Sequence, residues 1–75
     1  MTINGDIYLD HLHLKVLPDF LKDLVINGSF YCINNQLTSL KGGPKIVNGD
    51  FYLQNNKFTE KYVRSMCNVN GEIIC

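Results

Sequence analysis

The sequence predicts a small α/β fold, a short solenoid with a four-stranded parallel β ladder and with short helices or irregular turns on the opposite side. Asn-Gly occurs four times, at 4–5, 27–28, 48–49 and 70–71, and the glycines are 23, 21 and 22 residues apart. A short apolar and aromatic segment follows each pair. A period in the low twenties, with one such segment per repeat, is typical of one solenoid coil per repeat.

The repeats define a single domain over 1–75. It contains about three and a half repeats, at 4–26, 27–47, 48–69 and a truncated 70–75. The apolar content is ordinary for a globular protein, so a folded chain is expected. The sequence leaves open whether these repeats are a fragment of a longer array.

The segments that follow the Asn-Gly pairs are predicted to be strands, in which alternate side chains point to opposite faces. One face is uniformly apolar and is assigned to the core. It comprises Ile7, Phe30, Phe51 and Ile73 together with Leu9, Cys32, Leu53 and Cys75. The other face carries Tyr8, Tyr31, Tyr52 and Ile74. In stacked repeats the tyrosines are expected to form a row with a spacing of about 4.8 Å.

Polar residues before and after each strand are predicted to form the turns. Asn-Gly suits a tight turn that needs a positive φ, which glycine adopts without steric cost. Asn35 and Asn56 follow the second and third strands at equivalent positions, where Leu12 stands in the first repeat. Their amides are expected to bond backbone groups at the bend and to stack into a ladder.

The second halves of the repeats differ from one another. The first is predicted to form a short helix over 18–24, with Pro18 at its first position. Residues 42–44, Gly-Gly-Pro, predict an irregular turn. In the third repeat Thr59 is the expected N-cap of a helix over 60–67. The apolar stripes are Leu17, Phe20, Leu21, Leu24 and Val25 in the first helix and Tyr62, Val63, Met66 and Cys67 in the second.

A different local reading remains open. Residues 25–30 and 46–51 each place Asn-Gly between apolar residues, a pattern that also favours a β-hairpin. Hairpins would give antiparallel pairs in place of one parallel ladder. Recurrence over the whole period favours the solenoid, and the Ile and Val residues before each turn can add strand on a second side.

The stretch Phe30–Leu40, with Pro44 after it, resembles bacterial and bacteriophage leucine-rich repeats. The family pattern Asn-x-Leu-Thr-x-Leu is matched by 35–40, in part by 56–61, where Lys61 replaces a leucine, and weakly by 12–14. The resemblance implies that outward residues of the ladder line a surface that binds other proteins. The small size resembles a stand-alone phage-type protein, which would bind or inhibit a host protein in the host cytoplasm.

The outward face of the ladder is the candidate protein-binding site. Its residues are Tyr8, Tyr31, Tyr52 and Ile74, bordered by Asp6, Asp50 and Glu72. Tyrosine is favoured at interfaces, and the acidic border predicts a basic protein partner. The alternative interpretation is an aromatic ladder that only stabilises the sheet, with solvated carboxylates around it.

Two other functions follow from different parts of the chain. A basic surface on the back is the feature that would contact nucleic acid, although a net charge of zero gives no bulk attraction to phosphate. Its residues would come from Lys15, Lys22, Lys41, Lys45, Lys57, Lys61 and Arg64. The strand over 72–75 has no covering repeat, so its edge predicts a homodimer through edge pairing, or a structural subunit that self-assembles.

The sequence offers no catalytic, cofactor or metal site, and we predict a protein that is not an enzyme. His11 and His13 have no carboxylate or thiolate at ligand spacing. Nothing in the sequence brings Cys67 beside a histidine to make a nucleophile pair.

The cysteines and the lack of long apolar runs bear on location. Cys32 and Cys75 fall two strands apart, roughly 9.6 Å, beyond the reach of about 7 Å for a disulfide. Both are therefore expected to be reduced core residues in a cytoplasmic protein. No apolar run approaches the roughly 20 residues that span a bilayer, so no membrane association is predicted.

Overall fold

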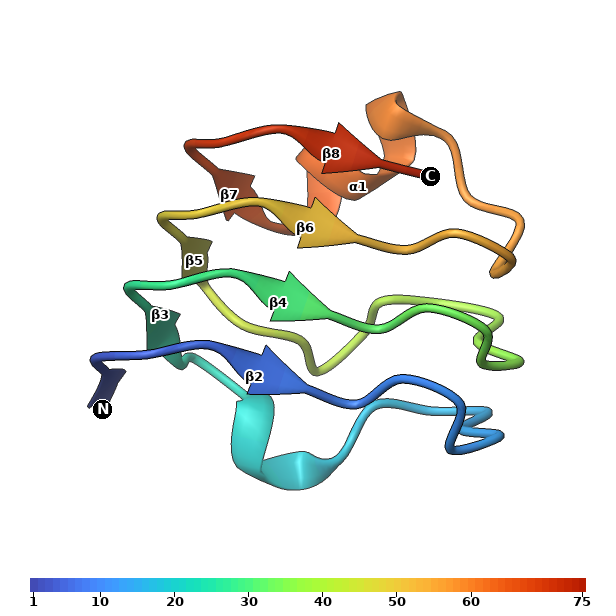
Figure 1. The fold of residues 1–75 in the computed structure, drawn as a ribbon, viewed down its shortest axis with the longest axis horizontal. Helices are drawn as coiled ribbons and strands as arrows, with labels where there is room; N and C mark the ends of the chain where they lie inside the picture. Colours follow the sequence, from blue (N-terminus) through green and yellow to red (C-terminus); the bar gives the residue numbers. More distant parts are fainter.

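The computed structural model describes residues 1–75, which form two four-stranded parallel sheets and one short α-helix (Figure 1). The front sheet contains β2 (Ile7–Tyr8), β4 (Phe30–Tyr31), β6 (Phe51–Tyr52) and β8 (Ile73–Ile74), in that order. The side sheet contains β1 (Thr2–Ile3), β3 (Val25–Ile26), β5 (Ile46–Val47) and β7 (Asn68–Val69). Each repeat therefore adds one short strand to both sheets.

The register of the front sheet follows the sequence period. Ile7 pairs with Phe30, Phe30 with Phe51, and Phe51 with Ile73, always in parallel. The predicted four-stranded parallel ladder is thus confirmed. The hairpin alternative is wrong, because the strands on either side of each Asn-Gly pair belong to different sheets. The side sheet, built from the residues before each turn, doubles the number of strands expected from the main prediction.

Backbone hydrogen bonds join successive repeats in both sheets. In the front sheet Phe51 N–H donates to Glu72 O at 2.8 Å, and in the side sheet Asn48 N–H donates to Ile26 O at 2.8 Å. A parallel pair places donors and acceptors on both strands, so each sheet has unpaired donors and acceptors at both of its edges.

The core lies between the two sheets and the second halves of the repeats. Phe30 and Phe51 are fully buried and stack with ring centroids 4.9 Å apart. Burial of each such side chain contributes roughly 1.5–3 kcal/mol of hydrophobic free energy. The predicted inward face is buried at its centre and half-buried at Ile7, Leu9 and Ile73. Cys75, however, is exposed, which corrects its assignment to the core. It follows the last strand, where no further repeat covers it.

The second halves contain η1 (Asp19–Leu21), one turn of 3-10 helix, and α1 (Glu60–Met66). The helix over 60–67 is confirmed to within one residue, and its N-cap is as predicted, because Thr59 Oγ1 accepts a hydrogen bond from Tyr62 N–H at 3.2 Å. The helix predicted over 18–24 is only η1, and the chain leaves it at Lys22. No helix has the length and apolar character needed to cross a membrane.

The Asn-Gly turns need glycine for a different reason from the predicted one. Gly42 is the only glycine with a positive φ. A Cβ added to Gly28 would lie 2.6 Å from Gly5 O, and one added to Gly49 would lie 2.7 Å from Gly28 O. Glycine is therefore required because the turns of successive repeats stack backbone on backbone, at distances that leave no space for a side chain.

Positive φ occurs instead at the bends after the front strands. His11, Asn34 and Asn55 occupy the same position in successive repeats, with φ of 57°, 57° and 64°. The left-handed region is open to asparagine more readily than to most residues. The side chains of this row also contact one another, since Asn34 bonds both His11 and Asn55.

The buried asparagines bond backbone at the bends, as predicted. Asn35 Oδ1 accepts from Leu12 N–H at 3.1 Å and Leu14 N–H at 3.0 Å, while its Nδ2 donates to Leu9 O at 2.8 Å. Asn56 likewise donates to Cys32 O at 2.7 Å in the preceding repeat. The two amides were expected to stack into a ladder, but they do not hydrogen-bond to each other. Each one spans the gap to the repeat before it and fastens two bends together.

An amide ladder does form, at the asparagines of the Asn-Gly pairs. Asn27 Nδ2 donates to Asn4 Oδ1 at 2.8 Å, Asn48 donates to Asn27 at 2.8 Å, and Asn70 donates to Asn48 at 2.6 Å. Asparagine ladders of this kind add to the stability of stacked parallel strands. The ladder has a direction, because every Nδ2 points to the preceding repeat.

All three cysteines are free thiols, and only one of them is exposed. Burial raises the pKa of Cys32 and of Cys67 to about 11. We expect one thiol, Cys75, to react with Ellman's reagent at pH ~8 in the native protein, and three after denaturation. The reaction should be slower than for free cysteine, because partial burial and the nearby Glu60 raise the pKa of Cys75. The Cys75→Ser variant should show no rapid reaction. Three rapid thiols in the native protein would contradict this packing.

Candidate functional site

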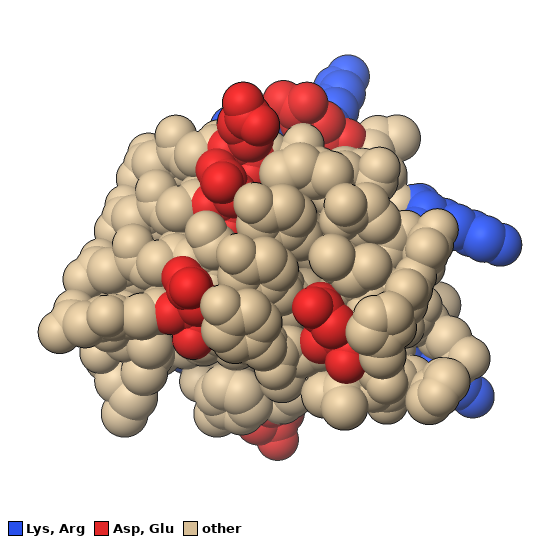
Figure 2. Space-filling view, in the orientation of Figure 1, with Lys and Arg blue, Asp and Glu red and all other residues tan.

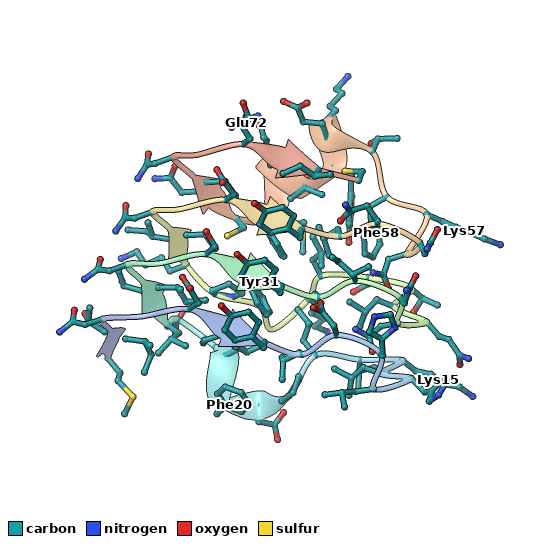
Figure 3. The ribbon with its side chains drawn as sticks, viewed as in Figure 1. Lys15, Phe20, Tyr31, Lys57, Phe58 and Glu72 are labelled. Atoms are coloured by element: carbon teal, nitrogen blue, oxygen red, sulfur yellow. The ribbon has the colours of Figure 1, made fainter.

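The front sheet displays a continuous row of stacked tyrosines, here called the tyrosine row (Tyr8, Tyr31 and Tyr52). Ring centroids are 4.6 Å apart for Tyr8 and Tyr31 and 4.5 Å apart for Tyr31 and Tyr52, with interplanar angles of 8° and 2°. Figure 3 shows Tyr31 projecting from β4 at the centre of this face. The parallel register brings equivalent residues into line, so the predicted row is present.

Stacking determines which parts of the rings reach solvent. Each ring covers a face of its neighbour, so the row presents ring edges and hydroxyl groups. Tyr8, which has a stacked ring on one side only, is 64% exposed, whereas Tyr31 and Tyr52 are half-buried. Ile74 continues the row on β8 and is also half-buried, where the sequence predicted an exposed side chain. The result is a rigid aromatic strip along the sheet.

The carboxylates beside the row accept hydrogen bonds from backbone N–H groups and also face solvent. The sequence does not predict the first of these roles. Asp6 accepts from Ser29 N–H at 2.7 Å and from the Tyr8 hydroxyl at 3.2 Å. Asp50 accepts from Glu72 N–H at 2.9 Å and from the Tyr52 hydroxyl at 3.4 Å. The recurring Asp-x-Tyr pattern at 6–8 and 50–52 is the sequence signal for this arrangement.

The middle of the row differs from its ends. Ser29 occupies the position of the aspartates, and its Oγ accepts from Asp50 N–H at 3.0 Å. The Tyr31 hydroxyl consequently bonds no carboxylate, and it interacts with the hydroxyls of Tyr8 and Tyr52 on either side. The Glu72 carboxylate has no hydrogen-bond partner within the chain. The centre of the face therefore offers a phenol without a carboxylate partner, with carboxylates on both sides along the stack.

Charge is unevenly distributed around this face. Figure 2 shows carboxylates spread over it and lysine or arginine atoms only at its margin. Lys15 and Lys57 lie at the far end of the bends, away from Tyr31 (Figure 3). Arg64 forms an ion pair with Glu60 at 3.0 Å. The acidic and aromatic composition predicted for the ladder face is thus present on the side seen in Figure 2.

The Asp6–Tyr8 contact gives a titration that can be measured. The hydrogen bond to Asp6 is the largest cause that raises the pKa of Tyr8 above 10.0. A raised pKa means that the folded state favours the neutral phenol, so this contribution to stability is complete below pH ~10 and is lost as the pH rises through the folded pKa. We expect Asp6→Asn to lower the pKa of Tyr8. The titration is measured by the absorbance of the phenolate. Asp19→Asn is the control, because Asp19 is an exposed residue of η1. Identical titration curves for wild type and Asp6→Asn would contradict the contact.

The other candidate residues do not assemble into a site. His11 Nδ1 lies 3.1 Å from Asn34 Nδ2, and His13 is exposed. Cys67 is buried, with its Sγ 4.0 Å from Lys45 O. No group of three or more histidine, cysteine or acidic side chains is placed to hold a metal ion.

The tyrosine row lies on a surface without hollows. The largest hollow, about 590 Å³, lies beside α1 and is lined by residues that include Lys45, Arg64 and Asn68. None of the four hollows of the molecule is lined by a tyrosine of the row. Small-molecule sites are concave, so a flat strip fits a macromolecular surface better.

Comparisons with known proteins do not assign the chain to a family. No family model matches it, and no match is found among curated proteins or solved structures. The flat aromatic strip with its acidic border is thus the feature on which a functional assignment rests.

Proposed function

We propose that this chain is a short solenoid of the bacterial and phage leucine-rich-repeat type that binds another protein and catalyses no reaction. Its binding surface is the tyrosine face, which comprises Tyr8, Tyr31, Tyr52, Ile74, Asp6, Asp50 and Glu72. The observation that carries this proposal is the stacked tyrosine row, whose central hydroxyl bonds no carboxylate of the chain.

The row has the properties of an interface anchor. Its rings are already ordered by stacking, so binding costs little side-chain entropy. Tyrosine combines a large apolar area with a polar hydroxyl, which explains its enrichment among residues that contribute most to binding. Because both faces of the Tyr31 ring are covered by its neighbours, a partner would contact the ring edges of the row and bond the hydroxyl of Tyr31.

The charge on this face favours a basic partner. Glu72 is exposed and makes no hydrogen bond through its carboxylate. Asp6 and Asp50 each use two contacts within the chain, which leaves further lone pairs for a donor from outside. An arginine or lysine of the partner, placed beside Tyr31, would reach these carboxylates. Such charges chiefly govern the rate and the specificity of association.

The test is capture of a partner from bacterial lysate by wild type and by two variants. Tyr31→Ala removes the central ring of the row and its hydroxyl. Phe20→Ala is the matched control, because Phe20 is an aromatic that is 60% exposed on η1, away from the front sheet. Circular dichroism must show that all three fold alike. A protein retained by wild type and Phe20→Ala but lost by Tyr31→Ala supports the proposal.

The identified partner then allows a stricter test. Glu72→Gln should weaken binding of a basic partner and reduce its dependence on salt, while Tyr31→Ala should weaken binding at every salt concentration. Retention of the same proteins by all variants, or of none by any, would reduce the tyrosine row to an element of sheet packing.

A nucleic-acid-associated role for the basic residues is the second hypothesis, and it predicts a different result. Phosphate contacts cause a steep linear fall of log affinity with log salt concentration, whereas an aromatic interface responds weakly. The proposed setting is the cytoplasm, and for a phage-encoded protein the host cytoplasm, with a basic host protein as the target. That setting rests on the sequence resemblance.

A further inference from the structure

Nothing within a single chain requires glycine at position 5. Gly28, Gly49 and Gly71 lack side chains because each lies against the turn of the preceding repeat. A Cβ on Gly5 would meet no atom within 4 Å, and its φ is not positive. The position is therefore free within the fold, yet it carries the residue that permits backbone to stack directly on backbone.

The asparagine ladder and the row of stacked Asn-Gly turns both end in unpaired hydrogen-bonding groups. The groups at one end of each row are complementary to those at the other end. Asn4 uses its Oδ1 and has no acceptor for its Nδ2, whereas Asn70 uses its Nδ2 and has no donor for its Oδ1. Gly28 N–H donates to Gly5 O at 3.2 Å and Gly71 N–H to Gly49 O at 3.1 Å, which leaves Gly5 N–H and Gly71 O without partners. One end of the stack thus offers donors where the other offers acceptors.

The edges of the front sheet are also complementary, because each exposes both an N–H and a C=O group. Ile7 N–H donates to Ser29 O on the β4 side, so the backbone groups of Tyr8 point away from the sheet. Ile74 O accepts from β6, so the backbone groups of Ile73 point away at the opposite edge. If the ladder continued, Ile73 N–H would donate to the carbonyl of Asp6, as Phe51 N–H donates to that of Glu72.

We propose that copies of this chain stack head to tail, with the β1 and β2 end of one copy on the β7 and β8 end of another. Ile7 of the upper copy would pair with Ile73 of the lower one, and Asn4 Nδ2 would donate to Asn70 Oδ1. Gly5 would lie on Gly71 as Gly28 lies on Gly5. Both sheets, the asparagine ladder and the turn row would then continue from one chain into the next.

The surface at the first end also suits burial. Five of the six large apolar side chains that are exposed belong to the first repeat or the residue stretch before it, namely Met1, Tyr8, Leu12, Val16 and Phe20. Figure 3 shows Phe20 at the end of the stack opposite to Glu72. Exposed apolar clusters mark interaction sites, and a second copy would cover the open face of Tyr8 with Ile74.

Head-to-tail stacking differs from the homodimer predicted from the sequence. Two β8 edges related by a two-fold axis would run antiparallel, and neither could supply the Asn4 and Gly5 groups that continue the rows. A head-to-tail contact uses two different surfaces, so it forms open chains of copies unless the geometry closes a ring. It leaves the tyrosine face of each copy exposed and so goes beyond the proposed function.

The decisive variant is Gly5→Ala. Within one chain the added methyl group meets open space, so melting at low micromolar concentration should match wild type. In the stacked assembly it would meet the Gly71 turn at the separation that Gly28 would have from Gly5 O, 2.6 Å. Sedimentation velocity from low micromolar to millimolar concentration should show association of wild type and loss of association in Gly5→Ala.

Two further measurements identify the mode of contact. A Gly5→Ala chain still has an intact β8 edge, so a small proportion mixed into wild type should cap assemblies and shorten them. Glu72→Ala should weaken association, because the carboxylates of Asp6 and Asp50 accept the backbone N–H of the following repeat and that of Glu72 would accept Asp6 N–H of the next copy. Wild type that is monomeric at all concentrations, or Gly5→Ala that associates as wild type does, would overturn the proposal.

Discussion

Gly49→Ala is expected to lower the free energy of unfolding by about 3 kcal/mol or more. Its Cβ would lie 2.7 Å from both the carbonyl carbon and the oxygen of Gly28, and 2.6 Å from Ser29 Oγ. The backbone on that side belongs to the neighbouring repeat and cannot move without opening both sheets. Overpacking against backbone therefore costs at least as much as the upper range for core insertions. For a domain of this size that loss corresponds to a melting shift of roughly 12–24 °C.

The matched control for this variant is Gly5→Ala, which makes the same chemical change at the equivalent position of the first repeat. Since nothing lies within 4 Å of its Cβ, its stability should stay within about 0.5 kcal/mol of wild type at low protein concentration. Thermal and urea unfolding monitored by circular dichroism measure both values. Equal losses from the two variants would show that backbone entropy, and not contact between repeats, makes glycine necessary.

Asn35→Ala is expected to produce the second large effect, a loss of about 3 kcal/mol or more. Asn35 is 6% exposed, and its amide supplies the partners for two backbone N–H groups and one carbonyl of the first repeat. Each polar group left buried without a partner costs roughly 1–3 kcal/mol. Asp10 Oδ1 still accepts from Ile33 N–H at 2.6 Å at the start of this bend, so local opening should begin beyond it, where Asn35 holds Leu12 and Leu14.

The control for Asn35→Ala is Gln36→Ala, one residue further along the chain. Gln36 is exposed and its side chain makes no hydrogen bond, so removal of its amide should change stability by less than about 0.5 kcal/mol. Hydrogen exchange followed by mass spectrometry should locate the loss of protection in Asn35→Ala at 9–14. Protection lost uniformly over the chain would contradict a local fastening role.

The features that depend on a period could be predicted from the sequence. Parallel pairing joins residues one repeat apart, so the spacing of Phe30 and Phe51 already specifies their register. Alternation along a strand then places Tyr31 and Tyr52 on the opposite face from these phenylalanines, which gives the tyrosine row. Both inferences need only that repeats stack, which the repeated Asn-Gly pairs indicate.

The features that depend on position within the stack could not be predicted in this way. Phe20 fits a helical apolar stripe, yet it is exposed because the first repeat has no neighbour on one side. Cys75 fits the inward alternation but follows the last paired strand. A pattern of apolar residues records which face is inward and does not record which repeat is terminal.

The roles of particular polar residues also could not be predicted from the sequence and are visible only in the structure. Asp6 and Asp50 read as solvated charges, because a sequence does not reveal that their carboxylates receive backbone N–H groups from the next repeat. The sequence predicts a positive φ at the glycines of the Asn-Gly pairs, because such turns usually need one. In the structure, close stacking of the turns is the reason that glycine is required. Contacts across repeats are the common element in both cases.

The hydrogen-bonded turns also determine how the protein ages chemically. Asn-Gly sequences deamidate when the glycine nitrogen attacks the asparagine side-chain carbonyl, which expels ammonia and forms a succinimide that water opens to aspartate or isoaspartate. Asparagine is for this reason a thermolabile residue. The N–H groups of Gly28, Gly49 and Gly71 are held by a neighbouring carbonyl, whereas Gly5 N–H is free. Ageing should therefore begin at Asn4, and copies stacked end to end would protect even that residue.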